Sequence, residues 1–206
     1  MKKICITLIS LALTMQAWSQ TELSGKTLLA GLRARNIGPA VMSGRITDID
    51  VVLSKPETIY VGTAGGGIWK SVSGGTTFRP IFNDYAQSIG KITIDQSNPE
   101  IIWAGTGESW VRNSVGIGTG LYKSINGGTS WELAGLEDSE HISDILVHPK
   151  DGSTVYVGVQ GHLWGPNQQR GVFKTTDGGK TWTKVLYIDE NTGCADMDID
   201  PQNPDV

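Results

Sequence analysis

The sequence has few cysteines and few histidines. Of its 206 residues, two are cysteine and three are histidine. Only Cys194 lies outside the N-terminal apolar run, so no disulfide is expected within the rest of the chain. His141, His148 and His162 have neither one another nor a cysteine at the spacing of a zinc site. We therefore expect no metal and no cofactor.

The sequence also lacks basic clusters and long apolar runs. Its 17 Lys and Arg against 21 Asp and Glu give a formal net charge of −4, and the basic residues are scattered. That pattern argues against nucleic acid or an anionic membrane as a partner. The one apolar run, Ile4 to Met15, is too short to span a bilayer, so no membrane insertion is expected.

This apolar run has the features of a signal peptide. It follows Lys2 and Lys3 and precedes the small residues around Ala17-Trp18-Ser19. We expect residues 1–19 to be a signal peptide and residues 20–36 to be a lead-in. The protein is then exported to the periplasm, the extracellular space or the cell surface.

Glycine, by contrast, is plentiful, with 27 residues, and there are seven tryptophans. Short runs rich in Val, Ile, Tyr and Trp, separated by Gly, Pro and Asn, are typical of an all-β protein with tight turns. One turn sequence occurs three times, at intervals of about fifty residues. The copies are turn 1 (Ser71–Phe78), turn 2 (Ser124–Trp131) and turn 3 (Thr175–Trp182).

Each repeat contains four strand-like runs. Four strands repeating about every fifty residues predict a β-propeller of four-stranded antiparallel blades. A β-solenoid has shorter rungs, and tandem sandwiches need more strands per unit. We expect blades at about 37–83, 84–135 and 136–188, and the first hairpin of a fourth at 189–206, with Ala195 to Asp200 as its strand. This incomplete ring predicts that its partners are the remaining blades of a longer polypeptide.

Turn 3 resembles the Asp-box, or BNR repeat, whose form is Ser/Thr-x-Asp-x-Gly-x-Thr-Trp. Turn 3 matches it at Thr175, Asp177, Gly179, Thr181 and Trp182; turn 2 has Ser124, Asn126, Gly128 and Trp131, and turn 1 has Ser71, Ser73, Gly75 and Phe78. Asp, Asn and Ser each accept hydrogen bonds from backbone N–H groups, while glycine supplies positive φ. The aromatic residue buries a ring beside the sheet. We therefore interpret the motif as structural and not catalytic.

With segments such as Ser43-Gly44-Arg45-Ile46, the chain is similar to large exported BNR proteins. The resemblance implies a propeller like the N-terminal region of sortilin, in proteins that are often labelled glycosyl hydrolases. By analogy with other propellers, we expect the site on the face opposite the Asp-boxes. Two long loops, Glu108 to Thr119 and Gln160 to Arg170, lie on that face. The candidate ligand-binding residues are Arg45, Glu108, Arg112, His162 and Arg170.

Three functions remain open. A binding module would present this face to a glycan or a peptide. A glycoside hydrolase needs two carboxylates about 5 to 10 Å apart, for which Glu108 with Asp196 or Asp144 are the candidates. A sialidase needs three clustered arginines, whereas those available lie on different blades, so this is the least favoured. In a purely structural alternative, Glu108 and Arg112 hold their own loop together.

Overall fold

The computed structural model describes residues 45–110, 112, 114–200 and 202–204. The expected signal peptide, the lead-in and the first blade up to residue 44 lie outside these residues. The described part contains twelve strands and no α-helix, and none of its elements is a helix long and apolar enough to cross a membrane.

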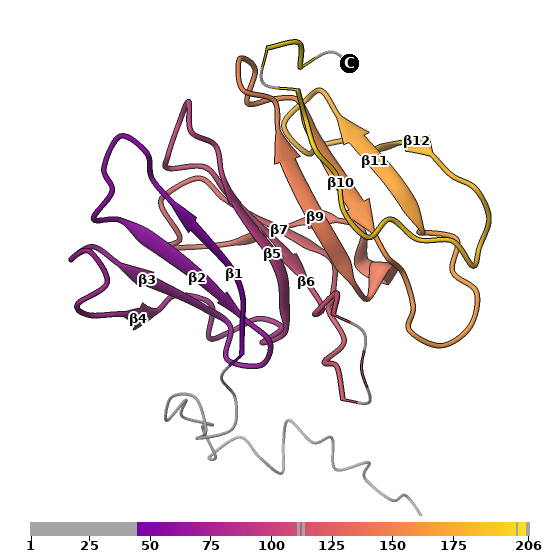
Figure 1. The fold of residues 1–206 in the computed structure, drawn as a ribbon, viewed down its shortest axis with the longest axis horizontal. Helices are drawn as coiled ribbons and strands as arrows, with labels where there is room; N and C mark the ends of the chain where they lie inside the picture. Colours follow the sequence, from indigo (N-terminus) through magenta and orange to yellow (C-terminus); the bar gives the residue numbers. More distant parts are fainter. Residues whose placement is uncertain (1–44, 111, 113, 201, 205–206) are drawn as a thin grey trace, which may run out of the picture. The chain divides into compact units, whose positions relative to one another are not determined.

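The strands form three four-stranded sheets, each antiparallel and each in chain order (Figure 1). Blade 1 contains β1 (Ile46–Val51), β2 (Ile59–Thr63), β3 (Ile68–Ser71) and β4 (Arg79–Pro80). Blade 2 contains β5 (Ile89–Ile94), β6 (Ile102–Thr106), β7 (Leu121–Ser124) and β8 (Glu132–Gly135). Blade 3 contains β9 (Ile142–Val147), β10 (Val155–Val159), β11 (Gly171–Thr175) and β12 (Thr183–Leu186). The prediction of four-stranded antiparallel units is confirmed.

The first strands of the three blades, β1, β5 and β9, are the inner strands and lie next to one another (Figure 1). Side chains on these strands bond to the backbone of the neighbouring blade. Asp50 on β1 accepts a hydrogen bond from the Ile94 N–H at 2.7 Å, and the Thr93 hydroxyl on β5 donates to the Ile145 carbonyl at 2.9 Å. Burial raises the pKa of Asp50, although the N–H groups of Ile94 and Val51 counteract it.

Two apolar cores lie between consecutive blades. The first joins blades 1 and 2 and includes Tyr60, Phe82 and Trp131. The second joins blades 2 and 3 and includes Trp103 and Phe173, with Trp182 packed against it. Each sheet therefore buries one face against the next sheet, so the stabilisation that a blade gains from burying apolar surface depends on the presence of its neighbour.

Each repeat turn is closed by its own polar side chains. In turn 3 the Asp177 carboxylate accepts bonds from the N–H groups of Lys180 and Thr181 and from the hydroxyls of Thr175 and Thr181. These donors, the Thr181 hydroxyl first, hold the pKa of Asp177 well below its usual range. Asn126 accepts the equivalent bond from the Ser130 N–H at 2.9 Å in turn 2.

The aromatic residue that ends each turn differs in burial. Trp131 is 5% exposed, and its Nε1 donates to the Ile81 carbonyl of blade 1 at 3.0 Å. Trp182 is partly buried against the second core, and its Nε1 donates to the Ala134 carbonyl of blade 2 at 2.7 Å. Phe78 in turn 1 is 42% exposed. The prediction that both tryptophans are mostly buried is therefore confirmed, with Trp182 the less deeply buried of the two.

Two predicted strands differ from the structure. The expected strand Thr77 to Phe82 is reduced to β4, although the Ile81 N–H still donates to the Ile68 carbonyl of β3 at 2.9 Å. The expected strand Ala195 to Asp200 is not a strand, because no ladder of backbone bonds forms along it in the described part of the chain. The segment is still fixed to blade 3 through the Cys194 N–H, which donates to the Val159 carbonyl at 3.0 Å.

Candidate functional site

A pocket of about 410 Å³ lies at the starting ends of the inner strands, here called the channel pocket. Its lining comes from all three blades and from the segment that follows them: Thr47, Asp48, Gly90, Lys91, Ser109, Trp110, Ser143, Ala195 and Asp196. The strand registers place the repeat turns at the opposite ends of the sheets, because Val155 pairs with Thr175 while Val159 pairs with Gly171. The pocket is therefore at the end away from the turns.

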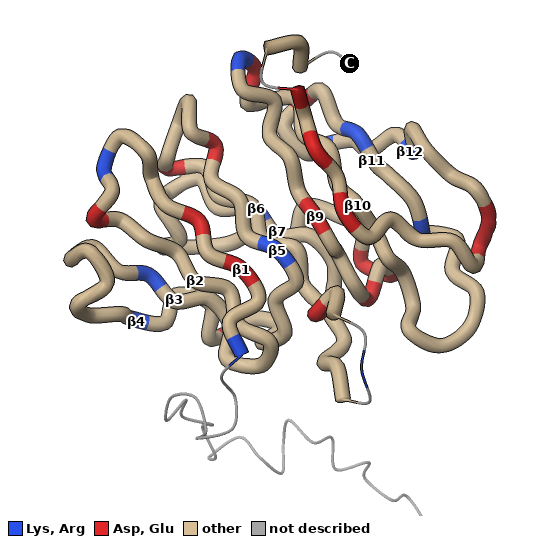
Figure 2. Tube along the Cα trace, viewed as in Figure 1, with Lys and Arg blue, Asp and Glu red and all other residues tan. Residues whose placement is uncertain are grey.

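At the channel pocket, a lysine that lines it lies between two aspartates, of which only Asp48 also lines it. The Lys91 Nζ lies 3.7 Å from the Asp48 Oδ1 on blade 1 and 3.3 Å from the Asp144 Oδ1 on blade 3. Figure 2 shows the same alternation, with acidic residues on β1 and β9 on either side of a basic residue on β5. Burial opposes the charged form of Lys91, but the two carboxylates outweigh it, so the pKa of Lys91 is raised.

Asp48, Lys91 and Asp144 occupy the same position in successive blades. Each pairs with the glycine of the adjacent strand, Gly62, Gly105 and Gly158 respectively. Successive blades thus place charges of alternating sign at one level of the inner strands.

The two aspartates also connect neighbouring blades. The Asp48 Oδ2 accepts a bond from the Ile92 N–H at 3.0 Å, and the Asp144 Oδ2 accepts one from the Met197 N–H at 3.1 Å. Because each acid pairs with Lys91 through its other oxygen, neither carboxylate is free to rotate. By this correspondence the exposed Asp196, next to Met197, takes the position of Lys91 for a fourth unit.

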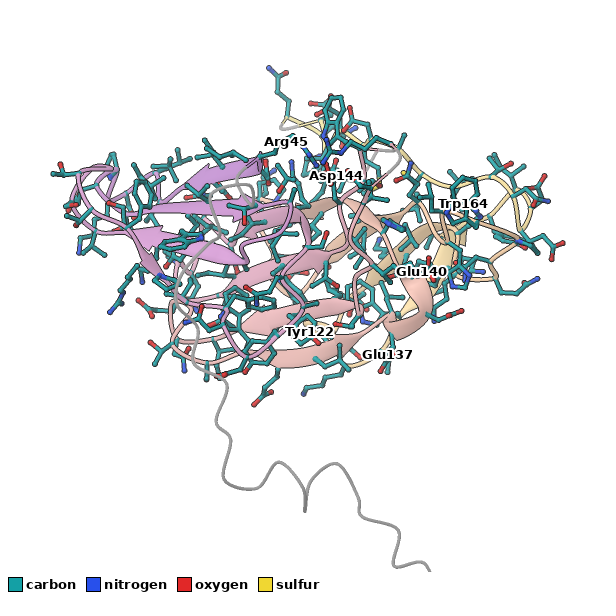
Figure 3. The ribbon with its side chains drawn as sticks, turned by 90° about the horizontal axis from the view of Figure 1, so that it is seen from below. Arg45, Tyr122, Glu137, Glu140, Asp144 and Trp164 are labelled. Atoms are coloured by element: carbon teal, nitrogen blue, oxygen red, sulfur yellow. The ribbon has the colours of Figure 1, made fainter. Side chains whose placement is uncertain are left out.

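Glu108 lies near the pocket but does not line it. Its side chain is 1% exposed, and its Oε1 pairs with the Arg45 Nη2 and lies 3.9 Å from the Arg112 Nε. Its N–H donates to the Ser88 hydroxyl at 2.9 Å. Arg45 directly precedes β1, and Figure 3 shows it on the same side of the molecule as Asp144. The structure thus brings three of the predicted residues together, as an ion-pair cluster beside the pocket.

Arg170 and His162 stabilise the loop between β10 and β11. The Arg170 guanidinium is buried and donates to the carbonyls of Gln160, His162 and Gly165. The His162 Nε2 lies 2.9 Å from the Asp138 Oδ1 and 3.7 Å from the Glu140 Oε1. Neither residue lines the channel pocket, so the structure does not join them to Asp196 there.

Sequence reasoning missed Asp48, Lys91 and the serines of the pocket. The signal that identifies the charged residues is their position, because each pairs with a glycine on the next strand of its repeat. Among the described residues, no group of three or more His, Cys, Asp and Glu side chains is arranged to hold a metal ion.

No family model matches the sequence, and no curated protein matches it. The fold is similar to solved glycoside hydrolase family 74 (GH74) structures. An ancestral GH74 enzyme aligns with a TM-score of 0.55 and 22% identity, over 74% of this chain and 20% of that chain. The GH74 xyloglucanase from Xanthomonas campestris aligns with a TM-score of 0.56 and 16% identity, over 79% of this chain and 26% of that one.

A third structure, the GH74 enzyme from Niastella koreensis, aligns with a TM-score of 0.51 and 21% identity, over 68% of this chain and 22% of that one. The chain therefore spans about a fifth to a quarter of the length of these proteins. At these identities the likeness concerns the fold. The three sheets are blades of a β-propeller, in agreement with the fold predicted from the repeats.

Proposed function

We propose that this chain is part of an exported β-propeller that binds a glycan at the channel pocket. The observation that carries the proposal is Trp110, which lines the pocket and is 72% exposed. An aromatic face open to solvent beside a polar cavity suits the apolar face of a sugar ring, where stacking excludes water. A tryptophan in that position also makes a poor contribution to the core of its own blade.

The remaining lining supplies hydrogen bonds for hydroxyl groups. Asp48 and Asp196 are acceptors, Lys91 is a donor, and Ser109 serves as either, whereas the Ser143 hydroxyl already donates to backbone carbonyls and can only accept. This mixture suits a neutral, hydroxyl-rich ligand better than a strongly charged one, because Lys91 is already paired with two acids.

A glycan is favoured over a peptide by the similarity to GH74 structures, one of which is a xyloglucanase by name. The Arg45–Glu108–Arg112 cluster supports the site by fixing the start of the loop that carries Trp110. Export through the N-terminal segment would bring the pocket to extracellular polysaccharides.

A second candidate function is glycoside hydrolysis. Two carboxylates, Asp48 and Asp196, line the same pocket, which is the minimum that such a reaction requires. Asp48 is engaged by the Ile92 N–H and by Lys91, whereas Glu108 is enclosed by two arginines. Binding without hydrolysis is therefore the better supported of the two.

The test is titration calorimetry of the mature chain with xyloglucan oligosaccharides, preceded by an array of soluble polysaccharides and peptides. Trp110→Ala should weaken glycan binding about tenfold, the loss expected from one stacked aromatic. Trp164→Ala is the matched control, because Trp164 is 84% exposed but lies outside the pocket, far out on blade 3 (Figure 3).

Two outcomes would contradict the proposal. Equal losses of glycan affinity in the two tryptophan variants would show that the glycan does not bind at the pocket. Binding of peptides but of no glycan would show that the ligand is a peptide. Release of reducing sugar that Asp196→Asn or Glu108→Gln abolishes would establish the hydrolase instead.

A further inference from the structure

At two places in the chain, a lysine of one blade binds the repeat turn of the next. The Lys70 Nζ on β3 donates to the Gly127 carbonyl in turn 2 at 2.8 Å. The Lys123 Nζ on β7 donates to the Gly178 carbonyl in turn 3 at 2.7 Å. The same bond thus recurs at both joints between blades.

Each of these lysines rests on an aromatic ring of its own blade. Lys70 lies 5.1 Å from the centre of the Tyr60 ring, and Lys123 lies 4.8 Å from that of Trp103. The Tyr60 hydroxyl donates to the same Gly127 carbonyl at 3.2 Å. Burial lowers the pKa of both lysines and raises that of Tyr60 to about 12. Each joint therefore contains a built receptor for a glycine carbonyl.

The incoming turn fits this receptor only because it carries glycine. A Cβ on Gly128 would approach the Ile81 side chain to 2.5 Å, and one on Gly179 would approach the Trp103 ring to 2.6 Å. Both glycines also have positive φ, of 83° and 91°. The backbone of the turn therefore packs directly against side chains of the preceding blade, which leaves no room for a Cβ.

Blade 3 has a third receptor of the same form. Lys174 on β11 lies 4.9 Å from the centre of the Tyr156 ring, and the two residues pair in register as Lys70 and Tyr60 do. In the part of the chain that the structure describes, no carbonyl accepts a hydrogen bond from the Lys174 Nζ. The flank also carries a largely apolar cavity of about 310 Å³, lined by Leu146, Tyr156, Met197, Asp198, Ile199 and Pro204.

A hydrogen bond from a backbone N–H at this flank shows where the inner strand of a next blade would lie. Met197 binds the Asp144 carboxylate through its N–H just as Ile92 binds Asp48 at the first joint. Residues 195–200 therefore take the place of an inner strand, beside the cavity and the free lysine.

We propose that the flank of blade 3 formed by Tyr156, Lys174 and the cavity receives the repeat turn of a fourth blade that begins with residues 195–200. A glycine carbonyl of that turn would accept the bond from the Lys174 Nζ, and the aromatic residue ending the turn would occupy the flank as Trp131 and Trp182 do. The proposal is independent of the glycan site.

The test extends the chain after Pro204 with a copy of residues 153–187, which supplies a turn of the right form. The thermal midpoint of unfolding should rise by several degrees, because a blade is added to the cooperative unit. Lys174→Met should remove about 2–4 °C of that rise while changing the parent chain by less than about 1 °C. Lys150→Met, on an exposed turn, is the control with the same loss of charge.

A second measurement remains informative if the extension folds poorly. Acetylation of lysines in the folded parent chain, followed by mass spectrometry, should modify Lys174 faster than Lys70 and Lys123, whose Nζ groups are bonded to carbonyls. Equal rates for all three would contradict the free receptor. A rise in midpoint that Lys174→Met leaves intact would overturn the proposal. Self-association of the parent chain abolished by Lys174→Met would make a second copy the occupant.

Discussion

The two ends of the blades are built on different principles. At the turn end, three copies of one sequence make nearly the same bonds within each turn, and turns 2 and 3 also accept a lysine bond from the preceding blade. At the pocket end, equivalent positions hold Asp48, Lys91 and Asp144, and the adjoining loops differ in length and composition. Repetition thus serves the joints between blades, while variation at matched positions creates a site that no single blade contains.

The largest effect should be seen at the turn end. Trp131→Ala removes a ring that is 5% exposed and a bond to the Ile81 carbonyl, so the free energy of unfolding should fall by about 3–5 kcal/mol. Phe78→Ala, at the same place in turn 1 but 42% exposed, should cost less than about 1 kcal/mol. Urea denaturation measures both, and similar losses would mean that burial between blades does not govern the turns.

An intermediate effect is expected at the pocket end. Lys91→Met leaves the buried Asp144 without its cation and should lower the free energy of unfolding by roughly 1–3 kcal/mol. The raised pKa of Lys91 sets the sign of the pH dependence. The difference between wild type and variant should be complete below the ordinary lysine pKa of about 10.4 and decline as the pH rises beyond it.

Denaturation at pH 7, 9 and 11 would measure this difference. If the difference in unfolding free energy between wild type and variant is unchanged at pH 11, packing of the lysine side chain, and not its charge, stabilises the inner strands.

The smallest effect should come from turn 3 in acid. Because hydrogen bonds depress the pKa of Asp177, its stabilising effect should be complete above the ordinary value of 3.8, decline as the pH falls below that value, and vanish only below the depressed pKa of the folded protein. The difference in unfolding free energy between wild type and Asp177→Asn should therefore be smaller at pH 3 than at pH 7. The difference between wild type and Asn126→Ala in turn 2 should not change, because an amide does not titrate. Denaturation at pH 7 and pH 3 distinguishes the two, and parallel behaviour would contradict the role given to the carboxylate.

The fold could be predicted because its signals are local and repeated. Glycine pairs, a terminal aromatic and alternating apolar residues determine turns and strands within a few residues of themselves. Their period then identifies the blade. The exceptions are two expected strands: one is reduced to β4, and residues 195–200 lack a neighbouring ladder.

The site was harder to predict because it depends on packing across blades. Glu108 and Arg170 stand in long loops and have reactive side chains, yet Glu108 is enclosed by arginines and Arg170 by backbone carbonyls. Contacts between residues far apart in the sequence determine which charged side chains are paired within the protein and so cannot bind a ligand. The position of Asp196 at the start of an expected inner strand points to the pocket, and the equivalent position in the other repeats leads to Asp48 and Lys91.

The bonds that Asp48 and Asp144 make to neighbouring blades bear on the thermodynamics of recognition. Both side chains, and Lys91 between them, already have a fixed rotamer in the free protein. Ordering a side chain on binding typically costs about 0.5–1.5 kcal/mol. Here folding has restricted that freedom in advance, so a ligand would meet a preorganised surface and lose little affinity to entropy. If the proposed glycan binds there, a variant that loosens two blades would weaken binding although the changed residue does not touch the ligand.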